Sequence, residues 1–340
     1  MKVFRYVLMG LGSLAVVVGV ALLALTQTRD DLSKFSAYVE QRNNETARAV
    51  TVTYMGNTNL LISDGETSIL TDGWFTRPST LDVAIGKIEP DLDAIANGME
   101  RGGVGKLAAI IPVHSHFDHA MDAPEVARRT GGLLVGSEST ANIGRGWGLP
   151  EEQIRVIGDG DVLRFGDFTV TMILSRHFAF PNAAMRDAAL EEPVIAEPLV
   201  PPVGALDYKE GGSYTIHVAH PLGSLLLQGS AGFIPGGLDG VKADIVALGV
   251  GGVAAQTTSY QSDYWEHVVR VTQPRKVYAV HWDSLTDPLA DQPVMPNLLW
   301  SRVLDFQAEA GVAYALEHAA KDGIEGALFP MWEPVTLFSE

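Results

Sequence analysis

The sequence contains no cysteine, and this absence removes several kinds of chemistry at once. Disulfide bridges, zinc sites with thiolate ligands, a thiol nucleophile and the lipidated cysteine of a bacterial lipoprotein are all excluded. Any metal site in this chain must therefore be built from histidine and carboxylate side chains. That set of ligands suits zinc, manganese or iron.

Positive charge is also scarce. Lysine and arginine number 24 against 41 aspartates and glutamates, which gives a formal net charge of −17 at pH 7. A protein with this balance repels phosphate backbones, so we expect no nucleic-acid partner. Hydrophobic residues make up 46% of the 340 positions, which allows one large domain or two smaller ones with a substantial core.

One long apolar run lies close to the N-terminus, at residues 7–25, after Lys2 and Arg5. As a helix it would just cross a hydrocarbon core of about 30 Å. The run is longer than the apolar core of most signal peptides, and Ala24-Leu25-Thr26 is a poor cleavage site. A retained anchor is therefore favoured over a cleaved signal segment.

The positive charges before this run would keep the N-terminus in the cytoplasm and place the rest of the chain outside it, in the periplasm or the extracellular space. The predicted organisation is a transmembrane anchor or signal segment at residues 1–26, a helical or flexible stalk at 27–48 and a catalytic domain at 49–340.

Four potential metal ligands follow an apolar run at residues 107–113, which is typical of a strand buried on both faces. These ligands are His114, His116, Asp118 and His119. Side chains alternate along an extended chain, so the first two histidines project to one side, whereas the last two ligands lie in the turn that follows. Such a cluster can hold two cations about 3.5–4 Å apart. A polar turn with incidental histidines is the alternative.

The pattern His-x-His-x-Asp-His resembles the signature of the metallo-β-lactamase-fold hydrolases. The resemblance implies an α/β fold, a four-layer αββα sandwich with zinc, or sometimes iron or manganese, at one edge of the sheets. It also implies further ligands at the ends of later strands, and two histidines occupy such positions. By analogy one metal is held by His114, His116 and His177, and the other by Asp118, His119 and His281.

A further family motif is an aspartate that braces the metal loop without binding metal, and Asp72 occupies its place at the end of a predicted hairpin strand. A simple Asp-Gly turn is the alternative. Trp74 and Phe75 follow, and would form either an aromatic lip over the site or an ordinary packed loop. Residues 178–212 lack periodicity and predict a lid or substrate loop, in which Phe178 is a candidate contact.

The chain departs from the family pattern at Ser230, where the family normally carries an aspartate that bridges both metals. A hydroxyl is a weak ligand, so the second metal should bind less tightly or not at all. Either His217 or His220 could supply a substitute ligand, although ordinary surface or core roles are favoured. Asp283, two residues after the last ligand, could orient that histidine or contact the substrate.

The resemblance implies a metal-dependent hydrolase that uses one or two zinc ions, or manganese or iron, to direct a metal-bound hydroxide at an ester, lactone or phosphodiester bond. Asp118 is the candidate general base if it does not bind metal. The strand at 244–252 and the ending Val280-His281-Trp282-Asp283 look most like the group of UlaG and N-acyl-phosphatidylethanolamine phospholipase D.

The anchor and the aromatic residues suggest a small-molecule or lipid-like substrate. Two other classes of function stay open. One is a metal-binding sensor or binding protein with a decayed hydrolase site, which Ser230 indicates. The other is an iron-dependent oxidoreductase, because the same fold also hosts such sites.

Overall fold

The computed structural model describes residues 2–41, 48–180, 183–190, 193–303 and 306–340, and its strands form two sheets. The first sheet contains, in spatial order, β14 (Pro334–Ser339), β1 (Ala49–Tyr54), β2 (Leu60–Ser63), β3 (Ser68–Thr71), β4 (Ala109–Ile111), β5 (Leu133–Gly136) and β6 (Ile154–Val156). The second contains β13 (Glu325–Ala327), β12 (Lys276–Val280), β11 (Ile245–Gly249), β10 (Gly223–Gln228), β9 (Tyr214–His220), β8 (Phe168–Leu174) and β7 (Val162–Phe165).

The two sheets are built alike. In the first, β14 to β3 pair antiparallel and β3 to β6 pair parallel; in the second, β7 to β10 pair antiparallel and β10 to β13 pair parallel. The carboxyl ends of parallel neighbours lie at the same edge of a sheet. Residues that follow these strands are therefore brought together at one edge of each sheet.

The inner faces of the two sheets share one apolar core, and the outer faces carry separate ones. Ile111 faces the core between the sheets, whereas its neighbour Ile110 packs outward. In the second sheet Ala247 faces inward, whereas Val246 packs outward. Side chains of a strand alternate between faces, so strands buried on both sides need the continuous apolar runs seen here.

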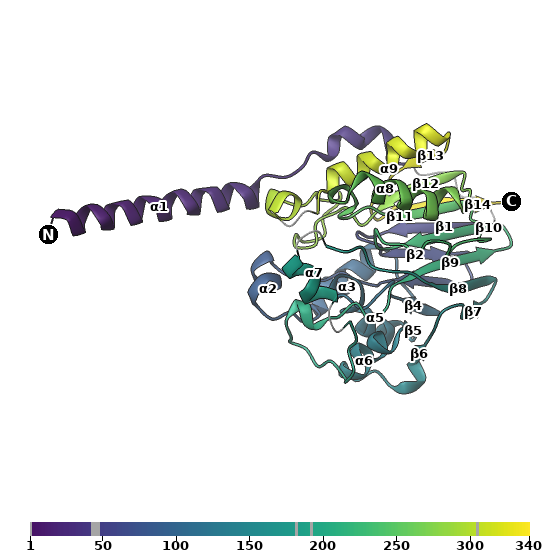
Figure 1. Ribbon diagram of the computed structural model, residues 1–340. Coiled ribbons are helices and arrows are strands. Elements are labelled where there is room, and N and C mark those ends of the chain that lie inside the picture. The colour runs from purple at the N-terminus through teal and green to yellow at the C-terminus, as the bar shows by residue number, and fades with distance from the viewer. Residues whose placement is uncertain (1, 42–47, 181–182, 191–192, 304–305) are drawn as a thin grey trace.

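Helices cover the outer faces of both sheets (Figure 1). On the first sheet lie α3 (Leu92–Arg101), α5 (Ala123–Thr130) and α6 (Glu138–Gly146). On the second lie α8 (Thr258–Tyr264), the π-helix η5 that continues it (Trp265–Arg270), and α9 (Ala308–Asp322). The other helical segments after β1 are α2 (Thr80–Ile85), α4 (Phe117–Ala120), α7 (Ala183–Leu190), η2 (Glu151–Gln153), η3 (Ala205–Asp207), η4 (Val253–Ala255) and η6 (Leu299–Val303). The predicted mixed α/β architecture with two sheets is confirmed.

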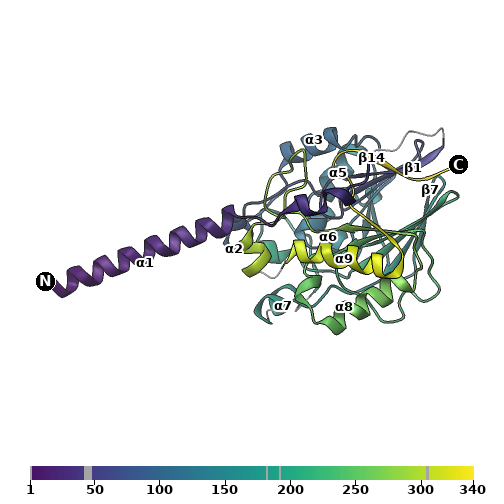
Figure 2. The same ribbon diagram turned by 90° about the horizontal axis from the view of Figure 1, so that it is seen from above.

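The N-terminal helix α1 (Lys2–Gln27) projects away from the sheets in both views (Figures 1 and 2). A membrane crossing needs about 20 predominantly apolar residues in one helix. Within the described part of the chain, no helix combines the length and the apolar character that such a crossing requires. This finding contradicts the predicted transmembrane anchor and the periplasmic or extracellular location that followed from it.

The segment predicted as a stalk packs on the outer face of the second sheet. Asp31 caps the short helix η1 (Leu32–Tyr38) by accepting a hydrogen bond from the Ser33 backbone, and Phe35 is buried in the outer core of that sheet. Farther on, Glu40 forms an ion pair with Lys276 at 2.6 Å. These contacts hold the segment from Asp31 to Glu40 on the domain.

We expect Phe35→Ala to lower the free energy of unfolding by about 3 kcal/mol, because a buried aromatic ring is removed from a packed core. Tyr38→Ala is the matched control, since that ring is 45% exposed in the same helix. It should change stability by no more than about 0.5 kcal/mol. Urea denaturation of the full chain measures both. Equal effects of the two substitutions would show that η1 does not depend on its buried face.

Candidate metal centre

Six side chains gather where strands of the two sheets end, and they form two triads. His114 and His116 follow β4, Asp118 and His119 lie on the short helix α4, and His177 and His281 follow β8 and β12. The first triad is His114, His116 and His177, and the second is Asp118, His119 and His281. The structure therefore brings together all six residues that the sequence predicted as ligands, in the two predicted sets.

The second triad has the spacing of a metal site. His119 Nε2 and His281 Nε2 are 3.2 Å apart, and Asp118 Oδ2 lies 3.4 Å from the first and 3.3 Å from the second. Donor atoms on a tetrahedral ion bound at about 2.0–2.1 Å lie about 3.3–3.4 Å from one another. All three side chains are buried, so the residues present fit a zinc-like ion.

The first triad is made of three histidines. His114 Nε2 and His116 Nδ1 are 3.0 Å apart, and the His177 ring centroid is 5.0 and 4.9 Å from the two other rings. His177 Nδ1 donates a hydrogen bond to the Phe178 carbonyl at 2.8 Å. The lone pair of Nε2 can therefore bind a metal. The rings of His114 and His119 are 4.1 Å apart, so the two triads adjoin.

Burial and charge set the protonation of these groups. Burial lowers the pKa of His114 and of His177 well below the ordinary value, and the neighbouring histidines add to the effect. Both imidazoles are thus neutral at pH 7, with a lone pair for an ion. Burial raises the pKa of Asp118, but His119 and His281 outweigh it and hold that pKa below its usual value, so Asp118 is a carboxylate.

Asp72 lies beside the second triad. Its Oδ2 accepts a hydrogen bond from His119 Nδ1 at 2.8 Å and another from the Thr58 hydroxyl, while Oδ1 accepts from the Val113 backbone at 3.0 Å. This contact fixes the His119 ring with Nε2 toward the triad. Asp72 itself is not one of the six clustered residues. Its contacts are those expected of the bracing aspartate.

The aromatic lip is absent. Trp74 and Phe75 are 0% and 1% exposed. Trp74 packs edge-on against Phe117 at 5.9 Å, and Phe75 fills the outer core beneath α3. The alternative of an ordinary packed loop is therefore correct, because the loop turns both rings into the protein rather than over the site.

Two other residues predicted to contact the substrate, Phe178 and Ser230, pack inside the protein instead. Phe178 is buried and stacks on His177 with ring centroids 4.5 Å apart. Ser230 is buried as well, and its hydroxyl accepts a hydrogen bond from the Phe178 backbone at 3.3 Å. The proposed substitutes for a bridging ligand lie elsewhere: His217 Nε2 meets the Lys242 carbonyl and His220 Nε2 lies 3.6 Å from Asp64.

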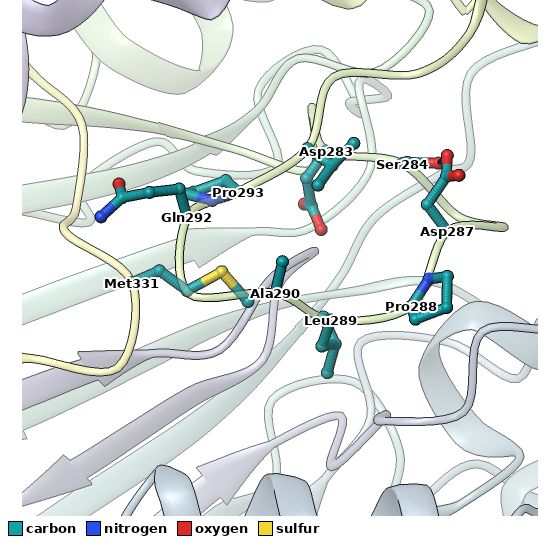
Figure 3. Close-up of a pocket in the computed structure, with 10 residues that line it drawn as sticks. Asp283, Ser284, Asp287, Pro288, Leu289, Ala290, Gln292, Pro293 and Met331 are labelled. Atoms are coloured by element: carbon teal, nitrogen blue, oxygen red, sulfur yellow. Dashed lines mark hydrogen bonds between the residues drawn. The ribbon is translucent and has the colours of Figure 1, made fainter. Parts of the chain in front are cut away.

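In the described part of the chain, the Asp283 carboxylate bonds to groups other than the His281 side chain. Its Oδ1 accepts hydrogen bonds from the Tyr54 hydroxyl at 2.9 Å and from the Asn57 backbone at 2.6 Å. Its carboxylate also borders a small pocket made by the loop that follows it (Figure 3). That pocket is lined by Asp283, Ser284, Asp287, Pro288, Leu289, Ala290, Gln292, Pro293, Val294 and Met331, and it includes none of the six clustered residues.

Sequence reasoning missed several residues around the centre. Arg77 is buried, stacks 3.6 Å above the Trp74 ring and lies 3.6 Å from the Asp283 carboxylate. Asn57 and Thr58 reach the second triad from the turn between β1 and β2. The only sequence signal was a polar run, Asn57-Thr58-Asn59, inside an otherwise apolar hairpin.

Asp122 is a further buried carboxyl that sequence reasoning missed. Its Oδ2 accepts hydrogen bonds from the backbone of Phe75 at 2.8 Å and of Thr76 at 2.6 Å, so it holds the loop that carries Arg77. Burial raises the pKa of Asp122 to about 6, although these hydrogen bonds and Arg77 oppose the shift. The folded protein therefore binds the Asp122 proton more tightly than the unfolded chain does.

Because the pKa of this carboxyl is higher in the folded state, its contribution to stability falls as pH rises from about 4 to about 6, and is constant above that. Asp122→Asn keeps an acceptor oxygen for the loop but does not titrate. We expect the variant to gain stability over the wild type across this window, by up to about 1.4 kcal/mol per pH unit. Urea denaturation from pH 4 to 8, with a chelator present, measures the difference in the free energy of unfolding between the variant and the wild type. A difference that does not change with pH would contradict the raised pKa of Asp122.

Comparison with known proteins finds sequence similarity to metal-dependent hydrolases. No protein-family model matches the chain. A UPF0173 metal-dependent hydrolase of Anaeromyxobacter sp. (strain K) is 27% identical over 130 residues, which is 37% of this chain and 42% of that protein. Another, from Chloroflexus aurantiacus, is 34% identical over 71 residues, or 21% of this chain and 29% of that protein. The matches thus span less than half the length of these curated relatives.

Two solved structures are similar over most of the chain. Igni18, a metallo hydrolase from Ignicoccus hospitalis, has a TM-score of 0.49 and 12% identity, and the match covers 86% of this chain and all of that one. An isothiocyanate hydrolase from Delia radicum gut bacteria has a TM-score of 0.49 and 17% identity, with 85% and 100% covered. The predicted resemblance to metal-dependent hydrolases is confirmed by sequence: part of this chain is similar to UPF0173 metal-dependent hydrolases, and no subfamily is specified.

Proposed function

We propose that this protein is a metal-dependent hydrolase whose two triads hold one or two divalent ions, with zinc as the preferred ion. The observation that carries the proposal is the second triad, in which three buried donor atoms from both sheets lie 3.2–3.4 Å apart. These spacings are those of donor atoms around one tetrahedral ion. Homology to metal-dependent hydrolases supports the same class of reaction.

A bound divalent ion would supply Lewis acidity and lower the pKa of water from about 15.7 toward about 7. The chain's own residues do the rest. Asp72 holds the His119 ring, and the Phe178 carbonyl holds the His177 ring, each with Nε2 directed at its triad. Asp118 stays ionised between two imidazoles, so it can bind an ion or accept a proton from the attacking water.

The surroundings of the triads favour a substrate with an apolar group beside the reacting bond. Phe180 stacks on His177 at 5.2 Å, and Phe306 lies 5.7 Å from the His281 ring. Both rings are half-buried, unlike Trp74 and Phe75. They can therefore shield a substrate from water.

Among the three bond types, a carboxylic ester or lactone is preferred over a phosphodiester. The net charge of −17 repels an anionic substrate and does not act on a neutral one. Membership of the UlaG and N-acyl-phosphatidylethanolamine phospholipase D group, which includes lactonases, is part of this proposal. A binding or sensing role is the second candidate, because Ser230 uses its hydroxyl to hold Phe178 and offers no bridging carboxylate.

The first test is metal content. We expect the purified full chain to retain one or two equivalents of zinc after dialysis. His281→Ala should lose the ion of the second triad, and where two ions are bound His177→Ala should lose that of the first, since each removes a donor from its triad. Loss of an ion should lower activity at least about a hundredfold. His217→Ala is the control, because that histidine is bonded to the Lys242 carbonyl away from the triads. Elemental analysis and a panel of chromogenic esters, lactones and bis(p-nitrophenyl) phosphate provide the two measurements.

The same experiment with Ser230→Asp counts the ions. A rise from one equivalent to two would show that the missing carboxylate leaves the native site mononuclear, whereas two equivalents in both would show that the triads suffice. An absence of metal in the wild type and in this variant would contradict the proposal. Metal without hydrolysis of any member of the panel would favour the binding protein.

A second prediction concerns substrate preference. Phe180→Ala should lower kcat/KM for a hexanoyl ester by about tenfold and leave an acetyl ester nearly unchanged, because only the longer chain would bury surface against the ring. Phe233→Ala is the control, since that ring packs on Tyr260 at 5.3 Å and on His267, away from the triads. Equal losses for the short and the long ester would refute an acyl-binding role of Phe180.

A further inference from the structure

The turn between β1 and β2 places a buried asparagine beside the second triad. Asn57 is 0% exposed, and its φ of 52° lies in the left-handed region. Asparagine tolerates that conformation better than most residues, but glycine adopts it at no steric cost. Its side-chain oxygen also has no hydrogen-bond partner among the described residues.

Asn57 is bonded to both loops that carry the second triad. Its side-chain amide donates a hydrogen bond to the backbone carbonyl of Asp118. Its own carbonyl accepts from the backbone N–H of His281 at 2.9 Å. One residue of the first sheet thus links a ligand that follows β4 to a ligand that follows β12 in the other sheet.

The backbone of Asn57 is itself held from the other side. Its N–H donates to Asp283 Oδ1 at 2.6 Å, and the same oxygen accepts from the Tyr54 hydroxyl. The neighbouring Gly56 is tightly enclosed, because a methyl group there would lie 2.8 Å from both the Arg77 guanidinium and the Asp283 carboxylate. The turn therefore has little freedom to move.

We propose that Asn57 is a positioning residue for the second triad, and that its amide sets the affinity of Asp118, His119 and His281 for their ion. This inference rests on the proposed function, since it assumes that an ion binds there. Metal sites require their donors to be held within about 0.5 Å of the productive geometry. The amide acts on α4 by fixing the carbonyl of Asp118, and α4 supplies two of the three donors.

The test compares Asn57→Gly with the wild type, both as full chains. Glycine keeps the left-handed backbone and the two backbone hydrogen bonds, and it removes only the amide. We expect zinc to bind at least about tenfold more weakly to the second triad of the variant, as is usual when a group that orients a ligand is lost. Binding to the first triad should be unchanged. Competition with a zinc chelator measures both affinities, and His177→Ala and His281→Ala assign them to the triads.

Gln273→Gly is the matched control. Gln273 also has a left-handed φ, of 56°, but it is exposed in the turn before β12. It should leave both affinities unchanged. If the wild type binds two ions and Asn57→Gly binds both with the affinities of the wild type, the positioning role is overturned and the hydrolase proposal is left intact. A single wild-type ion that is insensitive to His281→Ala would also overturn it. No bound zinc in the wild type would instead refute the proposed function.

Discussion

The structure depends on the meeting of strand ends from two separate sheets. Six candidate donor side chains face one another across that junction, although no disulfide joins the sheets and His281 is far from the other five in sequence. The shared inner core makes this arrangement rigid. Val113 and Val280, each directly before a candidate ligand, are both buried in it. A one-residue shift in either strand would turn the ligand to the wrong face, so packing of the inner core also fixes the site.

This junction carries backbone strain. Asn57, Asp72 and His281 all have φ values between 52° and 57°, a region that residues other than glycine rarely adopt. Each also makes a hydrogen bond within the junction. Strain of this kind persists only where the surrounding structure determines the conformation, and it commonly marks functional sites. Here the paired strands on both sides of the junction determine the conformation. The stability of the sheets therefore offsets the free-energy cost of the left-handed residues.

Much of the site could be predicted because its signal is local. His-x-His-x-Asp-His lies within one short stretch, and the two later histidines each follow a clear strand. The burial of Trp74 and Phe75, and the positions of Arg77 and Asn57, could not be predicted in the same way. They depend on contacts between distant segments, such as the Asn57 backbone with Asp283. The apolar run at the N-terminus predicted a membrane crossing from composition alone, and the structure contradicts it.

The replacement of a bridging carboxylate by Ser230 changes how the centre must be held together. A bridging aspartate would bind both ions and so fix the two triads relative to each other. Here the Ser230 hydroxyl is directed to the Phe178 backbone and stabilises the loop of His177 instead. The first triad is thereby braced on its own side, and the second is braced by Asp72 and Asn57. Contacts from the protein itself therefore hold both triads, and Asp72 reaches both, because it also accepts a hydrogen bond from the Val113 backbone directly before His114.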